Sequence, residues 1–191
     1  MRLEVTKAFL TQEECDALNA WALQGVTNGW VSTGTSSVGL TRNRLTSRMY
    51  GYRFTTPKIV KDVSKKVRSH VGVSTYPIIG KHGRDGAVVT CTYDGGDVHI
   101  HRDPRNFPKL ATLRCNVMTQ KPESGGVLHI ENEAVEIDVG DLHCYLVSEH
   151  PHYVTTVSGE IPRILWMFGA CVPADDWNSG RIELGETCGV S

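Results

Sequence analysis

The chain has 191 residues, of which 40% are hydrophobic and 21% are charged, and this composition is typical of one globular domain with a single core. It excludes a disordered chain and a fibrous repeat. Twenty basic and 21 acidic side chains give a formal charge of −1, which argues against a general polyanion binder, but residues 42–84 carry 11 basic and 1 acidic group whereas residues 85–191 carry 7 and 16.

The start of the chain, MRLEVTKAFLTQEE, has no apolar signal segment. The longest hydrophobic stretch, residues 164–172, is far shorter than the roughly 20 residues that span a bilayer. Six cysteines are scattered along the chain without a CxxC pair. We therefore expect a cytoplasmic protein with no membrane contact, whose thiols are reduced and mostly buried in the core.

Two helices are predicted near the start. Thr11 and Glu14 form a capping-box pattern ahead of an amphipathic segment. Thr56 and Pro57 mark a second start, with Pro57 at the first helical position and the basic residues on the solvent face. Between the two, residues 31–50 are polar and show no helical or strand periodicity, which predicts a long loop or an irregular edge hairpin. Loops of this length often form substrate lids.

From residue 87 the pattern changes to eight short β-type runs separated by Gly, Pro and Asp. They are AVVTCTY, DVHIH, TLRCNVM, GVLHI, AVEID, LHCYLV, HYVTTV and RILWMFGACV. This spacing predicts an antiparallel sandwich or jelly roll, so the fold class is mainly β (α+β). We expect a single domain with a helical flank and substrate lid at 1–86, a jelly-roll core at 87–172 and a C-terminal tail at 173–191.

One group of residues has the composition of a metal site. His101 and Asp103 are two apart and face the same side of an extended strand, so their side chains can converge. His152 opens the strand HYVTTV, which a jelly roll can bring alongside. Two histidines and one carboxylate with open coordination positions make the facial triad of non-haem Fe(II) oxygenases, where a co-substrate and O₂ bind.

A carboxylate-binding residue follows the triad. Arg163 lies eleven residues after His152, at the start of the last strand, and its guanidinium can hold a carboxylate bidentately. Arg114 and Asn116 share one face of TLRCNVM and can point into the same cavity.

The order of these elements resembles the Fe(II)/2-oxoglutarate dioxygenase superfamily, in its prolyl-4-hydroxylase-like branch. The resemblance runs through FLTQEECDAL, TYDGGDVHIHRD, SGGVLHI, VEIDVGDLHCYLV and HYVTTVSGEIPRILWMF. It implies a double-stranded β-helix with Fe(II) on His101, Asp103 and His152. It also implies that 2-oxoglutarate chelates the metal and places its distal carboxylate on Arg163, in a site shared with Asn116 and Arg114.

The resemblance implies the reaction as well. O₂ and 2-oxoglutarate would be converted to CO₂ and succinate while a substrate C–H bond is hydroxylated. Halogenating relatives lack the carboxylate ligand, so the presence of Asp103 favours hydroxylation. Typical prolyl hydroxylases of this branch carry Lys in place of Arg163 and Tyr in place of Asn116.

The substrate side of the site is indicated by nearby charges. Arg42, Arg44 and Arg48 cluster in the predicted lid, where they form either a solvated loop or a site for a carboxylate, a phosphate or a nucleic-acid backbone. His99 shares a face with His101 and is expected behind the metal ligands or toward the substrate. The HxH pair that it forms is also typical of cupins.

Other histidines have simpler interpretations. His150 is an alternative to His152, but Pro151 interrupts the strand beside it. His129 and His143 are predicted to be core or barrel-wall residues.

The sequence thus predicts an Fe(II)- and 2-oxoglutarate-dependent hydroxylase that acts on an amino-acid or peptide side chain, with an anionic substrate as one option. One alternative is a dioxygenase that oxidises a nucleotide or nucleic acid, favoured by the basic block. The other is a non-catalytic, cupin-like metal-binding module. No feature of the sequence indicates an oligomeric state.

Overall fold

The computed structural model describes residues 1–33, 41–50, 56–77 and 85–185, without the side chains of 32, 33, 41, 42, 50, 85 and 86. The helices are α1 (Gln12–Thr27), α2 (Lys58–His70) and α3 (Ala174–Asn178). The strands are β1 (Glu4–Thr6), β2 (Ser32–Thr33), β3 (Thr41–Tyr50), β4 (Asp85–His101), β5 (Ala111–Gln120), β6 (Ser124–Gly125), β7 (Leu128–Ile130), β8 (Glu133–Val135), β9 (Leu142–Leu146), β10 (His152–Val154), β11 (Val157–Ser158) and β12 (Arg163–Val172).

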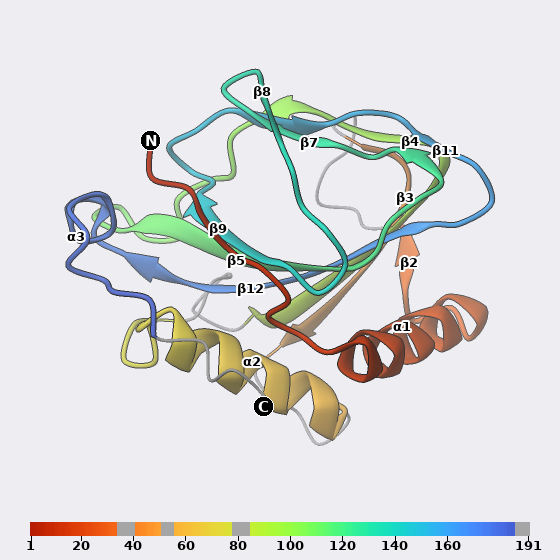
Figure 1. Cartoon of the computed structure of the whole chain (residues 1–191), viewed down its shortest axis with the longest axis horizontal. Helices are drawn as coiled ribbons and strands as arrows, with labels where there is room; N and C mark the ends of the chain where they lie inside the picture. Colours follow the sequence, from red (N-terminus) through yellow and green to blue (C-terminus); the bar gives the residue numbers. More distant parts are fainter. Residues whose placement is uncertain (34–40, 51–55, 78–84, 186–191) are drawn as a thin grey trace.

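Ten of the described strands form one curled antiparallel sheet, in the order β1-β9-β5-β12-β4-β10-β7-β8, with β3 on β4 and β2 on β3. The long strand β4 belongs to both walls. Its first half pairs with β12 and β3, whereas its C-terminal end pairs with β10. Because β4 runs through both walls, the sheet curls back over itself (Figure 1).

Two separate cores hold this arrangement. The larger lies between the helices and the outer face of the sheet, where α1 packs on β5 and α2 on β12 (Figure 1). The smaller lies inside the curled sheet and contains Tyr145, Val154 and Leu165. Apolar side chains thus fill much of the interior of the sheet. A polar side chain that is buried there is costly unless it is hydrogen-bonded or binds a ligand.

Both predicted helices are present. Thr11 is the N-cap of α1, and the box is complete: Glu14 N donates to Thr11 Oγ1 at 3.2 Å and Thr11 N donates to a Glu14 carboxylate oxygen at 3.0 Å. Helix α2 begins one residue later than predicted, because Pro57 is its N-cap and has an extended ψ of 149°.

Three segments depart from the sequence prediction. The runs AVVTCTY and DVHIH are one strand, β4. Residues 31–50 include the antiparallel pair β2–β3, so the edge-hairpin interpretation is the right one and the long loop is wrong. The expected helical flank also supplies β1, which pairs with β9 in the main sheet. The flank and the barrel thus share one sheet.

The C-terminal tail is docked as far as it is described. Trp177 on α3 is fully buried, its Nε1 donates to Arg2 O at 3.2 Å, and the Arg2 guanidinium lies 4.3 Å from the ring centroid. The five described cysteines are buried and unpaired, as predicted, and Cys188 lies outside the described residues. None of the described helices is long and apolar enough to cross a membrane.

Candidate metal centre and cavity

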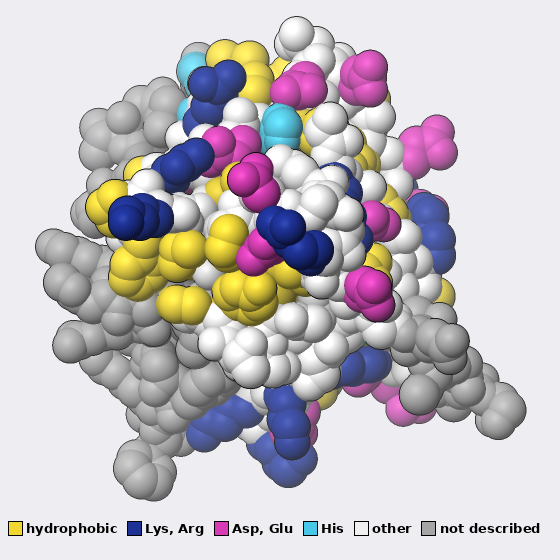
Figure 2. Space-filling model, turned by 90° about the vertical axis from the view of Figure 1, so that its left-hand side faces the viewer, with side chains coloured by type: hydrophobic (Ala, Val, Ile, Leu, Met, Phe, Trp, Pro, Cys, Tyr) yellow, Lys and Arg dark blue, Asp and Glu magenta, His cyan; other side chains and the backbone are white. Residues whose placement is uncertain are grey.

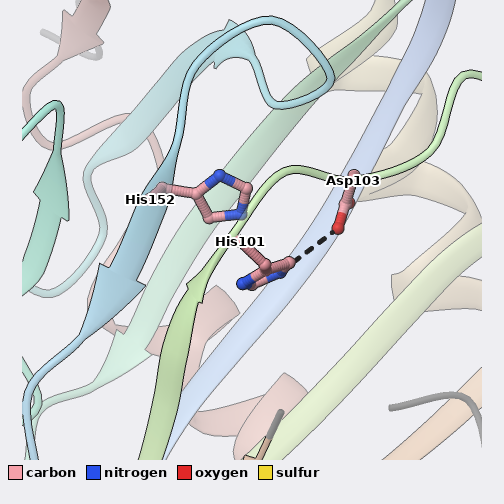
Figure 3. A group of neighbouring side chains, drawn as sticks. All are labelled: His101, Asp103 and His152. Atoms are coloured by element: carbon pink, nitrogen blue, oxygen red, sulfur yellow. Dashed lines mark ion pairs between the residues drawn. The ribbon is translucent and has the colours of Figure 1, made fainter.

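The three predicted metal ligands meet at the end of the curled sheet. His101 is the last residue of β4 and His152 the first of β10, and the two are direct cross-strand partners. Asp103 follows β4 and is fixed by its backbone N, which donates to Val147 O at 3.0 Å. One ligand atom from each residue lies within 4.8 Å of the other two, and the side chains point toward one another (Figure 3).

Backbone carbonyls set the orientation of both imidazoles. His101 Nδ1 lies 2.8 Å from His99 O, and His152 Nδ1 lies 3.1 Å from His150 O. A carbonyl only accepts, so each Nδ1 carries the proton and each Nε2 keeps a free lone pair when the ring is neutral. This arrangement of hydrogen bonds is the one that metal-binding histidines use.

Asp103 is held in its ionised form. Its Oδ2 accepts from Arg114 Nε and Nη2, both at 3.3 Å, and its Oδ1 lies 3.4 Å from His101 Nε2. Burial acts to raise the pKa of Asp103, but the hydrogen bond with His101 and the charge of Arg114 outweigh it, so the pKa lies well below its usual range. A carboxylate oxygen is thus available beside two imidazole nitrogens.

The pKa values of the two histidines are shifted in opposite directions. The hydrogen bond with Asp103 raises the pKa of His101, whereas burial lowers the pKa of His152. Metal binding at His101 would thus compete with protonation of its ring, whereas burial favours the neutral, metal-binding form of His152.

The ligands line a cavity of about 120 Å³, which has room for several water molecules. Strand β3 contributes Arg44, Thr46 and Arg48 to its wall, and apolar side chains of the sheet such as Val98 and Leu165 contribute another part. The cavity also contains the predicted co-substrate residues Arg114, Asn116 and Arg163.

Arg163 is a buried charge at the inner wall, only 2% exposed. Its Nε donates to Gly126 O at 2.9 Å, and no carboxylate among the described residues pairs with it. Burial, and secondarily the charge of Arg44, lowers the pKa of Arg163 to about 10. A buried guanidinium without a counter-ion among the described residues is suited to bind an anionic ligand.

Asn116 and His143 form a buried polar pair in the same cavity, and sequence reasoning did not assign His143 to it. They are cross-strand partners on β5 and β9, and Asn116 Nδ2 lies 3.2 Å from His143 Nε2. Asn116 Oδ1 and His143 Nδ1 are buried without a partner among the described residues. Burial, and secondarily the charge of Arg163, lowers the pKa of His143 to about 3, so its ring is neutral. The signal in the sequence that could have indicated this pair is a polar residue between apolar neighbours in each of the two strands.

His99 lies outside the cavity. A β-bulge places Val98 opposite Val154 and His101 opposite His152, which breaks the alternation, so Val98 and His101 line the cavity. The prediction that His99 and His101 share a face is therefore wrong. His99 Nε2 instead lies 3.3 Å from Asp97 Oδ1, at a shallow groove on the outside.

The remaining candidates occupy other places. His150 pairs with Glu131 at 2.8 Å, and His129 stacks on Tyr153 at 4.6 Å between ring centroids. Arg42 lies on β3 opposite Asp97, and its side chain is outside the described part of the chain.

Three solved structures resemble this architecture. The chain is similar in structure to the viral collagen prolyl hydroxylase of Paramecium Bursaria Chlorella virus-1, solved as a 2-oxoglutarate complex (TM-score 0.65, 16% identity, 90% of this chain and 97% of that chain). It is similar to a Pseudomonas putida prolyl-4-hydroxylase (0.63, 14%, 88% and 92%). A third match is a Trichoplax adhaerens prolyl hydroxylase in complex with a hypoxia inducible factor peptide fragment (0.65, 19%, 87% and 83%).

These likenesses confirm the predicted jelly roll, and they lie in the branch that the sequence resembles. No protein-family model and no curated protein sequence matches the chain.

Proposed function

We propose that this protein is a non-haem Fe(II)- and 2-oxoglutarate-dependent oxygenase that hydroxylates its substrate. The observation that carries the proposal is the convergence of two imidazoles and one carboxylate at a cavity that also contains the buried Arg163, for which the described residues offer no counter-ion. This donor set suits Fe(II) and leaves coordination positions open.

The residues that would hold each component follow from the geometry. His101, Asp103 and His152 would hold the metal, with Arg114 fixing the carboxylate. Arg163 would bind the distal carboxylate of 2-oxoglutarate, since its planar fork fits that group and no carboxylate among the described residues pairs with it.

The neutral pair Asn116–His143 would supply a further hydrogen bond to the same carboxylate. In either orientation of the Asn116 amide, the pair has at least one donor left over: His143 Nδ1–H if Nδ2 donates within the pair, or the amide NH₂ if the amide is turned. This chain uses two small polar groups where prolyl hydroxylases of the branch carry Tyr.

The bound metal and co-substrate supply the oxidising power, in the balanced reaction of 2-oxoglutarate, O₂ and R–H to succinate, CO₂ and R–OH. The protein positions the components, keeps Asp103 ionised and both imidazoles in the ligating tautomer, and excludes bulk water with the apolar interior of the sheet. The preferred substrate class is an amino-acid or peptide side chain, supported by the structural likeness to prolyl hydroxylases. The cytoplasmic location and the lid role of the segment 1–86 stay predictions from the sequence.

Succinate release tests the proposal. Purified protein with Fe(II), ascorbate, O₂ and 2-oxoglutarate should release succinate slowly without substrate, and His152→Ala should abolish the release. His129→Ala is the matched control, because His129 stacks on Tyr153 outside the cavity. Equal release from both variants would contradict the metal assignment.

A further inference from the structure

Strand β3 turns a row of polar side chains toward the metal ligands. Arg44, Thr46 and Arg48 alternate along it and all line the cavity. The strand enters this register through an irregularity between Arg42 and Arg44, where Asn43 has φ 39° and its Nδ2 donates to Asp94 O at 2.9 Å. The left-handed conformation at Asn43 thus begins the segment that presents Arg44 to the interior.

The charge of the cavity is not balanced by its expected contents. Leaving Arg48 aside, Arg44, Arg114 and Arg163 face the single carboxylate of Asp103. A divalent cation and the dianion 2-oxoglutarate cancel each other, so the loaded cavity would still carry two positive charges in excess. Arg163 and Arg114 have assigned roles, which leaves Arg44 without an anion.

Arg44 is placed to bind a group beside the metal. It is half-buried, and no carboxylate among the described residues pairs with it. Burial lowers the pKa of Arg44 to about 10, while the nearby charge of Asp103 raises it. The charge of Arg44 also acts on His101 and on Arg163, so Arg44 lies within electrostatic reach of both ends of the cavity.

We propose that the substrate of this enzyme carries an oxyanion, either a carboxylate or a phosphate, which Arg44 binds with Thr46 beside it. The proposal rests on the proposed function, because it names the substrate class of that same site. A guanidinium binds both oxyanions through paired N–H donors, and the Thr46 hydroxyl adds a neutral donor.

The occupant is a small molecule rather than a nucleic acid. Arg44 is recessed in a cavity of about 120 Å³, whereas a polynucleotide backbone needs a track of exposed basic groups. On the face seen in Figure 2, the described Lys and Arg side chains are interspersed with Asp and Glu. The carboxylate of an amino acid and the phosphate of a mononucleotide are the two sources to compare.

Inorganic phosphate is the first probe. Protein loaded anaerobically with Fe(II) and saturating 2-oxoglutarate is titrated with phosphate in a calorimeter, so that Arg163 is already occupied. We expect one phosphate per chain, with affinity about tenfold to a hundredfold weaker in Arg44→Gln, the effect of losing a charge-assisted contact. Arg44→Lys should fall between the two, and Lys65→Gln, which removes an exposed charge on α2, should match the wild type.

The source of the oxyanion follows from competition. Free L-amino acids are compared with their carboxamides, and nucleoside 5′-monophosphates with their nucleosides, as displacers of phosphate. In the matching pair, only the charged member should displace phosphate. A neutral amide or nucleoside that binds as tightly, phosphate that does not bind the wild type, or phosphate that binds Arg44→Gln equally would overturn the inference. Tight binding of an oligonucleotide that survives Arg44→Gln would overturn the small-molecule assignment.

The two proposals fail separately. The Fe(II)–2-oxoglutarate absorption band reports loading in every variant, and its retention in Arg44→Gln shows that this variant is folded. If the wild type lacks the band, the oxygenase assignment fails, while an Arg44-dependent phosphate site measured without loading would still support the anion site.

Discussion

Arg163 offers a prediction in which stability and ligand affinity move in different directions. The pKa of about 10, lowered from 12.5 mainly by burial, means that holding this charge in the cavity without a bound anion costs on the order of 3 kcal/mol. Arg163→Met removes that cost but leaves Gly126 O without its donor, which costs about 1–3 kcal/mol. We therefore expect the free energy of unfolding without ligand to stay level with the wild type or to rise by up to about 2 kcal/mol.

Ligand affinity should behave otherwise. A bidentate guanidinium–carboxylate contact contains two charge-assisted hydrogen bonds, so Arg163→Met should weaken 2-oxoglutarate binding by about 3 kcal/mol or more, roughly 150-fold. Urea unfolding without ligand and an anaerobic 2-oxoglutarate titration measure the two quantities.

Leu165→Ala is the control for the unfolding assay. Leu165 lies on the same strand and lines the same cavity, so the substitution should lose about 2–5 kcal/mol of stability. If Arg163→Met lost several kcal/mol of stability yet bound 2-oxoglutarate as the wild type does, Arg163 would be a structural residue and the reasoning would be refuted.

Three further predictions concern other parts of the chain. Burial, and secondarily the charge of Arg163, lowers the pKa of His143 to about 3 from the ordinary 6.5, while Asp141 acts to raise it, so the unfolded state binds the proton first and stability falls as pH drops from 6.5 to 3. The full loss is on the order of 5 kcal/mol. In urea unfolding across this pH range His143→Gln should flatten the dependence, and an unchanged slope would contradict the buried neutral ring. Trp177→Ala should cost about 3–5 kcal/mol of unfolding free energy because the fully buried ring docks the tail, and a loss below about 1 kcal/mol would show that the tail is not docked in solution. Asp103→Ala should weaken Mn(II) binding by about 100-fold or more in a fluorescence titration while Arg105→Gln, which loses only an exposed pair with Glu149, keeps it; equal affinities would exclude the carboxylate as a ligand.

The convergence of His101, Asp103 and His152 could be predicted from the sequence because local rules bring most of it about. His101 ends β4 and Asp103 comes two residues later, so the local course of the chain brings these two together, and the capping box at Thr11 depends only on residues three apart. Pairing of β4 with β10 then brings in His152, which the order of strands indicated.

The rest of the site depends on irregularities that composition does not encode. One bulge sends His99 out of the cavity, and an irregularity at Asn43, inside β3, precedes the part of the strand that presents Arg44 to it. His143 looked like a wall residue because only the register of β5 and β9 sets it opposite Asn116. A one-residue change of register reverses the face of every later side chain, so these contacts could not be predicted from the sequence.

The central claim is that His101, Asp103 and His152 hold Fe(II) in a cavity that also takes 2-oxoglutarate. Anaerobic addition of Fe(II) and 2-oxoglutarate to the wild type should produce a visible charge-transfer band that saturates at one equivalent of each. His101→Ala should give no band while His129→Ala gives the full one. A wild type without the band, or a His101→Ala variant that retains it, would contradict the account.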